Sequence, residues 1–130
     1  MVQLTVRLTT KTGRAESTVR ALRGTMRQAL LNGGCTRAHI SADVDDAAVF
    51  WYCEEWEDAE ELEFQLRSER FSQLLSLVET GAQPPLLEFR VVGAVRGLEY
   101  IAAVRGAGAP ESGTAGPGPD DASHVERSRE

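Results

Sequence analysis

The sequence is poor in side chains that hold metal ions. It contains two histidines and two cysteines among 130 residues. His39 lies in a predicted strand and His124 in a Gly- and Pro-rich tail, and the cysteines, Cys35 and Cys53, do not pair with histidines at metal-ligand spacing. A metal-dependent oxygenase needs a cluster of histidine and carboxylate ligands, which one strand histidine does not supply. We therefore expect no metal site and interpret the cysteines as buried thiols on neighbouring strands.

The sequence also lacks a glycine-rich loop of the kind that cradles phosphates. Gly33-Gly34 follows a segment with helical spacing, residues 15–32, so this pair is typical of a helix stop and not of a phosphate loop. Flavin and nicotinamide enzymes require such a loop between a strand and a helix. We expect a protein without a cofactor.

Basic charge and long apolar runs are scarce as well. The chain has 14 basic and 20 acidic residues, a formal net charge of −6, which argues against a non-specific nucleic-acid-binding protein. No apolar run approaches the roughly 18 residues of a membrane span, and no signal peptide precedes the first predicted strand. The sequence therefore predicts a soluble, cytoplasmic protein with no nucleic-acid or membrane partner.

What the sequence does contain is a regular succession of strand and helix patterns. Asp58 and Ser68 are N-cap residues that open two helices. The other predicted elements are strands over residues 2–9, 35–43, 49–53, 86–92 and 98–105 and a helix over residues 15–32. The length fits one domain, over residues 1–105, and the Gly- and Pro-rich residues 106–130 are predicted to be a disordered tail.

The strand over residues 49–53 is apolar on both of its faces. Its sequence is Val-Phe-Trp-Tyr-Cys, whereas a strand with one wet face alternates apolar and polar residues. Helices cover one face of such a sheet, so a monomer would expose several large side chains on the other. We therefore predict a homodimer. The period of two also puts Trp51 on the face opposite to Tyr52 and Trp56.

A family resemblance rests on Glu54-x-Trp56, the acidic residues after it, Leu62, and Ser68-x-x-Phe71. This spacing resembles the antibiotic biosynthesis monooxygenase (ABM) family. The resemblance implies an α+β, ferredoxin-like antiparallel sheet with helices on one face, which dimerises into an α/β barrel. Family members include cofactor-independent oxygenases of aromatic polyketides, haem-degrading enzymes and proteins of no known activity, so the function has to be argued from the site.

The chain departs from the family pattern at three positions. The haem-degrading members carry a tryptophan and a histidine at the places of Gln65 and Leu75. Many other members carry histidines at the places of Gln65 and Arg70. The resemblance therefore argues against haem degradation, and it transfers no catalytic histidine to this chain.

The remaining chemistry is oxygenation in which an electron-rich phenolic substrate itself reduces dioxygen, while the protein supplies deprotonation, orientation and a dry cavity. The sequence offers cationic, proton-accepting and aromatic side chains for such a site: Arg7 or Arg90 to hold a phenolate, His39 or Gln65 to position or accept a proton, and Trp51, Tyr52, Trp56 and Phe71 as walls. Each has a purely structural alternative as a core, interface or surface residue. The competing functional hypothesis is a non-catalytic dimeric barrel that binds a small hydrophobic molecule or a partner.

Overall fold

A computed structural model describes residues 1–107 and divides into two units, residues 1–93 and the segment that starts at residue 94. The first unit contains seven elements: β1 (Val2–Thr9), α1 (Ala15–Leu30), β2 (Cys35–Ala42), β3 (Val49–Trp56), α2 (Ala59–Leu66), α3 (Glu69–Glu79) and β4 (Leu86–Val91). The second unit contains α4 (Leu98–Ala107). Most of the predicted tail, residues 108–130, lies outside the described residues.

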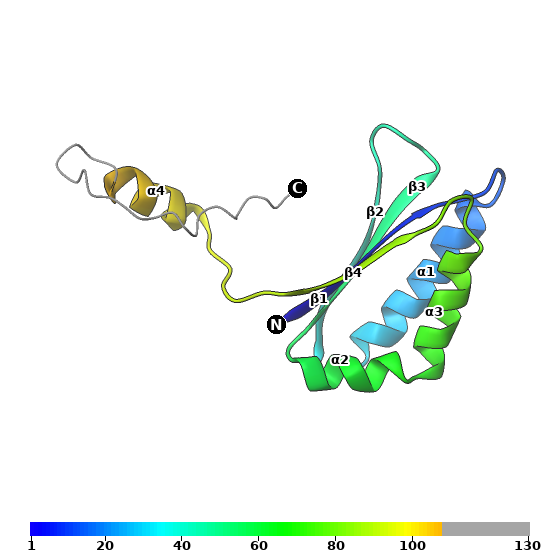
Figure 1. The fold of residues 1–130 in the computed structure, drawn as a ribbon, viewed down its shortest axis with the longest axis horizontal. Coiled ribbons are helices and arrows are strands. Elements are labelled where there is room, and N and C mark those ends of the chain that lie inside the picture. The colour runs from blue at the N-terminus through cyan, green and yellow to red at the C-terminus, as the bar shows by residue number, and fades with distance from the viewer. Residues whose placement is uncertain (108–130) are drawn as a thin grey trace. The chain divides into compact units, whose positions relative to one another are not determined.

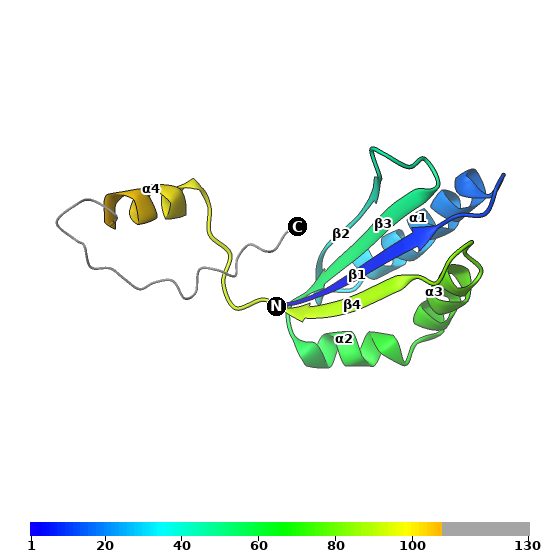
Figure 2. The same ribbon diagram turned by 45° about the horizontal axis from the view of Figure 1, so that its top comes forward.

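The first unit is an α+β, ferredoxin-like fold. Its four strands form one antiparallel sheet in the order β2-β3-β1-β4. Helices α1, α2 and α3 lie on one face of this sheet (Figures 1 and 2). The expected fold class is therefore confirmed, and the opposite face of the sheet carries no helix of this unit. We call that surface the helix-free sheet face.

The central strand β1 shows how the sequence produces the core. Val2, Leu4, Val6 and Leu8 are buried, and the residues between them are half-buried, which is the alternation expected of a strand. Leu4, Val6 and Leu8 form one core cluster with Leu22, Phe71, Leu74 and other apolar side chains, and Val2 belongs to a second cluster around Trp56 and Leu62. Burial of this apolar area is the main force that holds the helices on the sheet.

The two predicted helix starts are confirmed. The Asp58 carboxylate accepts a hydrogen bond from the Glu61 backbone N–H at 2.9 Å, and the Ser68 hydroxyl accepts one from the Phe71 N–H at 3.2 Å. Both bonds satisfy N–H groups that a helix leaves without a partner in its first turn. They fix where α2 and α3 begin, and so fix the position of Arg70 above the sheet.

The predicted strand over residues 98–105 is wrong, because this segment forms the helix α4. Short apolar runs do not distinguish strand from helix by period alone. Here the leucine, glutamate, arginine and paired alanines favour a helix more strongly than the isoleucine and valine favour a strand. Leu98, Ile101 and Val104 are exposed on it.

The two faces of β3 differ more than the sequence indicated. Phe50, Tyr52 and Trp56 face the helices, whereas Trp51 and Cys53 lie on the helix-free sheet face. The alternation also puts Val49 on that face; Val49 is buried and Trp51 is half-buried, so β3 exposes no large apolar side chain fully. The expectation that β3 alone would expose several large side chains is therefore wrong, and the predicted homodimer needs other support.

Candidate functional site

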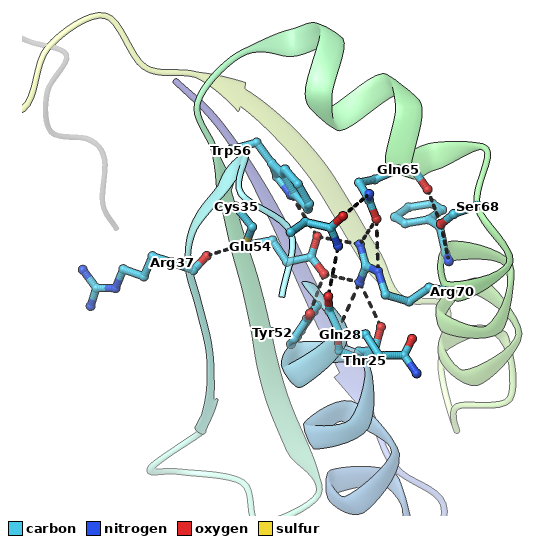
Figure 3. Close-up of polar contacts among 12 residues, drawn as sticks. Thr25, Gln28, Cys35, Arg37, Tyr52, Glu54, Trp56, Gln65, Ser68 and Arg70 are labelled. Atoms are coloured by element: carbon cyan, nitrogen blue, oxygen red, sulfur yellow. Dashed lines mark hydrogen bonds and ion pairs between the residues drawn. The ribbon is translucent and has the colours of Figure 1, made fainter. Parts of the chain in front are cut away.

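A buried carboxylate, Glu54, lies at the centre of the helix-covered side of the sheet. Its side chain is fully buried, yet it occupies a strand position between the aromatic residues Tyr52 and Trp56. Its Oε2 atom accepts hydrogen bonds from the Tyr52 hydroxyl at 2.5 Å and from Arg70 Nη1 at 2.7 Å. Its Oε1 atom accepts bonds from Trp56 Nε1 at 3.0 Å and from Arg70 Nη2 at 3.3 Å. The carboxylate thus has a charged partner and four donors (Figure 3).

Arg70 reaches this carboxylate from the first turn of α3 and is itself fully bonded. Its Nε and Nη2 atoms each donate to Gln65 Oε1 at 3.3 Å, and Nη1 also donates to the Thr25 hydroxyl at 2.9 Å. The amide group of Gln65 in turn donates to Asn32 Oδ1 at 3.2 Å. We call Tyr52, Glu54, Trp56, Gln65 and Arg70 the buried ion-pair cluster.

Within the buried ion-pair cluster, Tyr52 holds its proton firmly. Burial, followed by the negative charge of Glu54, raises the pKa of Tyr52 far above its ordinary value. Tyr52 therefore stays protonated and donates to Glu54. Since the acceptors of Glu54 and the N–H groups of Arg70 all have partners, this cluster offers no vacant proton acceptor to a substrate. Its geometry suits a structural link between β3, α1 and α3.

The helix-free sheet face brings together a different set of groups. Arg7 on β1 lies opposite Trp51 on β3, and its guanidinium carbon is 5.9 Å from the centre of the Trp51 ring. His39 on β2 is exposed and lies opposite Cys53, two residues along β3 from Trp51. Within the described residues, Arg7 forms no ion pair with a carboxylate. A cation, an aromatic wall and an imidazole therefore share this surface.

The candidate residues of the sequence thus separate into two groups. Arg7, His39, Trp51 and Arg90 lie on the helix-free sheet face, although Arg90 is exposed and pairs with Glu88 at 2.8 Å. The others lie under the helices: Tyr52, Trp56 and Gln65 in the buried ion-pair cluster, and Phe71 in the hydrophobic core. The two groups cannot line one pocket, because the sheet separates them.

Sequence reasoning missed the pairing of Glu54 with Arg70. One signal was present: Glu54 shares its face of β3 with Tyr52 and Trp56, so the alternation puts a carboxylate into an apolar layer. A buried carboxylate requires a cationic partner or several donors. Arg70, on the second helix after β3, was the residue to test for that role.

The two cysteines are free and lie on adjacent strands, as expected. Cys35 is buried and Cys53 is half-buried. Burial raises the pKa of both thiols, and Glu54 and Glu55 respectively add to the effect. Raised pKa values disfavour the reactive thiolate.

In residues 1–107, no group of three or more histidine, cysteine, aspartate or glutamate side chains is arranged to hold a metal ion. None of the helices in this part of the chain is long and apolar enough to cross a membrane.

Comparison with known proteins connects this fold to one family. The model of the family described as antibiotic biosynthesis monooxygenase matches residues 1–76. A candidate antibiotic biosynthesis monooxygenase of Deinococcus radiodurans superposes with a TM-score of 0.69 at 15% identity, covering 75% of this chain and 98% of that protein. Another from Nitrosomonas europaea gives a TM-score of 0.64 at 19% identity, covering 72% of this chain and 100% of that protein.

A third similar structure is a conserved protein of unknown function from Bacteroides thetaiotaomicron. It gives a TM-score of 0.62 at 22% identity and covers 68% of this chain and 94% of that protein. At these identities the superpositions establish a shared fold. No curated protein matches the sequence.

Proposed function

Because the chain belongs to the antibiotic biosynthesis monooxygenase family, we propose that it is a cofactor-independent monooxygenase that oxidises a small aromatic substrate with dioxygen. The observation that carries this proposal is the convergence of Arg7, Trp51 and His39 on the helix-free sheet face. The buried ion-pair cluster has no vacant acceptor, so the proposed chemistry uses the other side of the sheet.

In the proposed reaction, each of the three side chains has a separate task. His39 accepts the proton of a substrate phenol, since an imidazole is the side chain that most often serves as a general base. The Arg7 guanidinium binds the resulting phenolate, and Trp51 packs against the substrate ring. The electron-rich phenolate then reduces dioxygen directly. One oxygen atom enters the product and the other leaves as water, and the substrate supplies all the electrons.

The spacing between the strands suits a small aromatic substrate. β3 lies between β1 and β2, so the backbones at Arg7 and His39 are two strand spacings apart across the sheet, about 10 Å, and two residues apart along it, about 7 Å. Both side chains have to reach the same phenolic oxygen across this gap, and the Arg7 guanidinium already extends over Trp51 on the middle strand. The substrate ring then lies against Trp51.

The helix-free sheet face is open in one copy of the chain, and this proposal requires it to be closed. A second copy packed sheet to sheet about a two-fold axis would form a barrel and exclude water from Arg7 and Trp51. Dry surroundings strengthen the interaction between a guanidinium and a phenolate. We therefore propose that the active form is the homodimer.

One observation favours the alternative, a non-catalytic dimeric barrel that binds a small hydrophobic molecule or partner. Positions 65 and 70, where many family members carry histidines, are occupied here by Gln65 and Arg70, and both serve the buried ion-pair cluster. A chain that retained the family fold but lost its catalytic groups would have this arrangement.

Oxygen uptake distinguishes the two functions. The purified protein is incubated under air with a panel of dihydroxyaromatic compounds and no added flavin or metal. An enzyme would consume oxygen faster than the compounds autoxidise in buffer. Arg7→Gln and His39→Gln should each lower this rate at least tenfold, since a positioned acid–base group contributes about 10²–10⁴-fold.

Arg90→Gln is the matched control, because Arg90 is an exposed arginine of the same face that already pairs with Glu88. Its rate should stay near that of the wild-type protein. Oxygen uptake equal to the buffer rate with every compound, or an equal loss in Arg90→Gln and Arg7→Gln, would contradict the proposed reaction and leave the binding function in its place.

A further inference from the structure

We infer that the chain has a second site, a phosphoryl-binding cavity at the amino end of α1. The cavity has a volume of about 350 Å³. Its lining comes from the end of β1, the loop into α1, the first turn of α1 and the end of α3: Leu8, Thr10, Lys11, Arg14, Ser17, Thr18, Leu77, Thr80 and Gly81. It lies on the helix-covered side of the sheet and shares no residue with the helix-free sheet face.

Close packing of two loops forms one end of this cavity. The Ala82 backbone N–H donates to the Thr9 carbonyl at 2.8 Å, which ties the loop after α3 to the end of β1. A Cβ atom added at Gly81 would lie 2.8 Å from the Thr9 oxygen, so a larger residue does not fit there. Figures 1 and 2 show both loops at the same end of the sheet.

The charged side chains that line the cavity are cationic. Lys11 and Arg14 are its charged lining residues, and no carboxylate lines it. Neither cation forms an ion pair within the described residues. The amino end of α1 adds to this field, because its N-cap position is Arg14, which provides no side-chain hydrogen bond to the first turn. A 16-residue helix without such a cap presents free N–H groups and a partial positive charge to an anion.

The hydroxyl groups of the cavity provide the independent observation. Three of the four already donate to backbone carbonyls: Thr10 to Ala48 at 3.0 Å, Ser17 to Arg14 at 3.1 Å and Thr80 to Leu77 at 2.7 Å. The fourth, Thr18, is only 8% exposed. Its hydroxyl has no hydrogen-bond partner among residues 1–107, although buried hydroxyls normally have one. An unpaired donor beside two unpaired cations indicates a ligand that carries acceptors.

The set of donors favours a phosphoryl group over a carboxylate. A phosphate monoester has three terminal oxygens and up to two negative charges, and so it can engage a lysine, an arginine, a hydroxyl and helix N–H groups together. A carboxylate has two oxygens and one charge. The apolar side chains of Leu8 and Leu77 would contact the organic part of a small phosphate ester. The loop has one glycine, Gly13, with a positive φ of 79°, and it lacks the repeated glycines of a dinucleotide site.

Titration of the full-length protein with inorganic phosphate, followed by NMR shifts of the backbone amides, tests this inference. We expect saturable binding in the millimolar range, with the largest shifts in residues 11–18. Thr18→Val keeps the shape of the side chain and removes its hydroxyl. It should weaken phosphate binding about tenfold, because the loss of one hydrogen bond to a charged group raises Kd by about that factor. Thr18→Ser retains the hydroxyl and should bind within twofold of the wild-type protein.

Two variants of exposed residues make the test independent of the fold. Lys11→Gln should weaken phosphate binding at least fivefold, whereas Arg20→Gln, an exposed arginine of α1 that does not line this cavity, should leave it unchanged. Equal affinity in Thr18→Val and the wild-type protein would overturn the inference. Equal losses of phosphate affinity in the Lys11 and Arg20 variants would overturn it too. So would binding that does not saturate by about 50 mM phosphate, a limit set by the expected millimolar affinity. Acetate that binds as tightly as phosphate would overturn the phosphoryl assignment. If Thr18→Val does not fold, the Lys11 and Arg20 pair decides the outcome.

Discussion

Replacement of Arg70 by methionine is the most informative single perturbation of the fold. Methionine keeps a long apolar side chain and removes the cation that compensates the fully buried carboxylate of Glu54. The variant leaves Glu54 with the Tyr52 and Trp56 donors alone. It also leaves Gln65 Oε1 without the two bonds that Arg70 donates.

The burial of the Glu54–Arg70 ion pair sets the size of the expected loss of stability. Breaking a buried ion pair by removing one partner costs about 3–5 kcal/mol, a large part of the roughly 5–15 kcal/mol that stabilises a domain. For a domain of about 100 residues, each kcal/mol lowers Tm by about 4–8 °C. We therefore expect Arg70→Met to lower Tm by at least about 12 °C, if it folds at all.

The assay is urea unfolding followed by tryptophan fluorescence at a fixed protein concentration, because Trp56 belongs to the buried ion-pair cluster and donates a hydrogen bond to Glu54. Arg90→Met is the matched control. The N···O distance of the Arg90–Glu88 pair, 2.8 Å, is close to the 2.7 Å of the Arg70–Glu54 pair. The Arg90 side chain, however, is 57% exposed. Exposed pairs contribute about 0–1 kcal/mol, so this variant should unfold almost like the wild-type protein.

A double variant separates lost charge compensation from lost packing. Glu54→Gln combined with Arg70→Met removes both charges, and the new amide oxygen still accepts a bond from Tyr52 or Trp56. It should be more stable than Arg70→Met alone by at least about 1 kcal/mol, since the uncompensated charge is gone. A single variant that loses less than about 1 kcal/mol, or a double variant no more stable than the single one, would refute the electrostatic argument.

Three further perturbations test other parts of the structure. Tyr52→Phe removes a buried donor to Glu54 and should destabilise the protein by about 1–3 kcal/mol in urea unfolding. In the wild-type protein the folded-state pKa of Tyr52 is raised above the ordinary tyrosine value of about 10. The stability that protonated Tyr52 contributes should therefore be complete below about pH 10 and should be lost as the pH rises above that value. Ionisation of Tyr52 at about pH 10 in the folded protein, measured by tyrosinate absorbance, would contradict this pH dependence. Ser68→Ala removes the N-cap of α3 and should cost about 1 kcal/mol, with no change expected in Ser72→Ala as the control. Gly13→Ala forces a Cβ into a positive φ of 79° and should cost about 1–2 kcal/mol by the same measurement.

The sequence predicts those parts of the fold that depend on local chemistry. The alternation in β1 and the acidic and hydroxyl caps at Asp58 and Ser68 are each set by neighbouring residues, and the structure confirms them. The helix α4 was missed because a short apolar segment satisfies both periods. Its alanines carried the useful signal.

The candidate site was harder to predict, because it depends on which faces come together. The period of two separates Trp51 from Tyr52 and Trp56 already in the sequence, and the register of β3 confirms that separation. The partner of Glu54 could not be read in this way, because it depends on how α3 docks over the sheet, 16 residues further along the chain. The alternation indicates the buried carboxylate, whereas the choice of Arg70 as its partner is a consequence of tertiary packing.

The closed bonding of the buried ion-pair cluster also constrains how this sequence can diverge. Because Glu54, Gln65 and Arg70 satisfy one another, a substitution at any one of them leaves a buried charge or amide without its partner, and descendants that carry it are less stable until a second change follows. These positions should therefore be inherited together. Among close relatives of this chain, arginine at position 70 should occur together with glutamate at position 54 and an acceptor at position 65, a pattern that an alignment of those relatives would reveal.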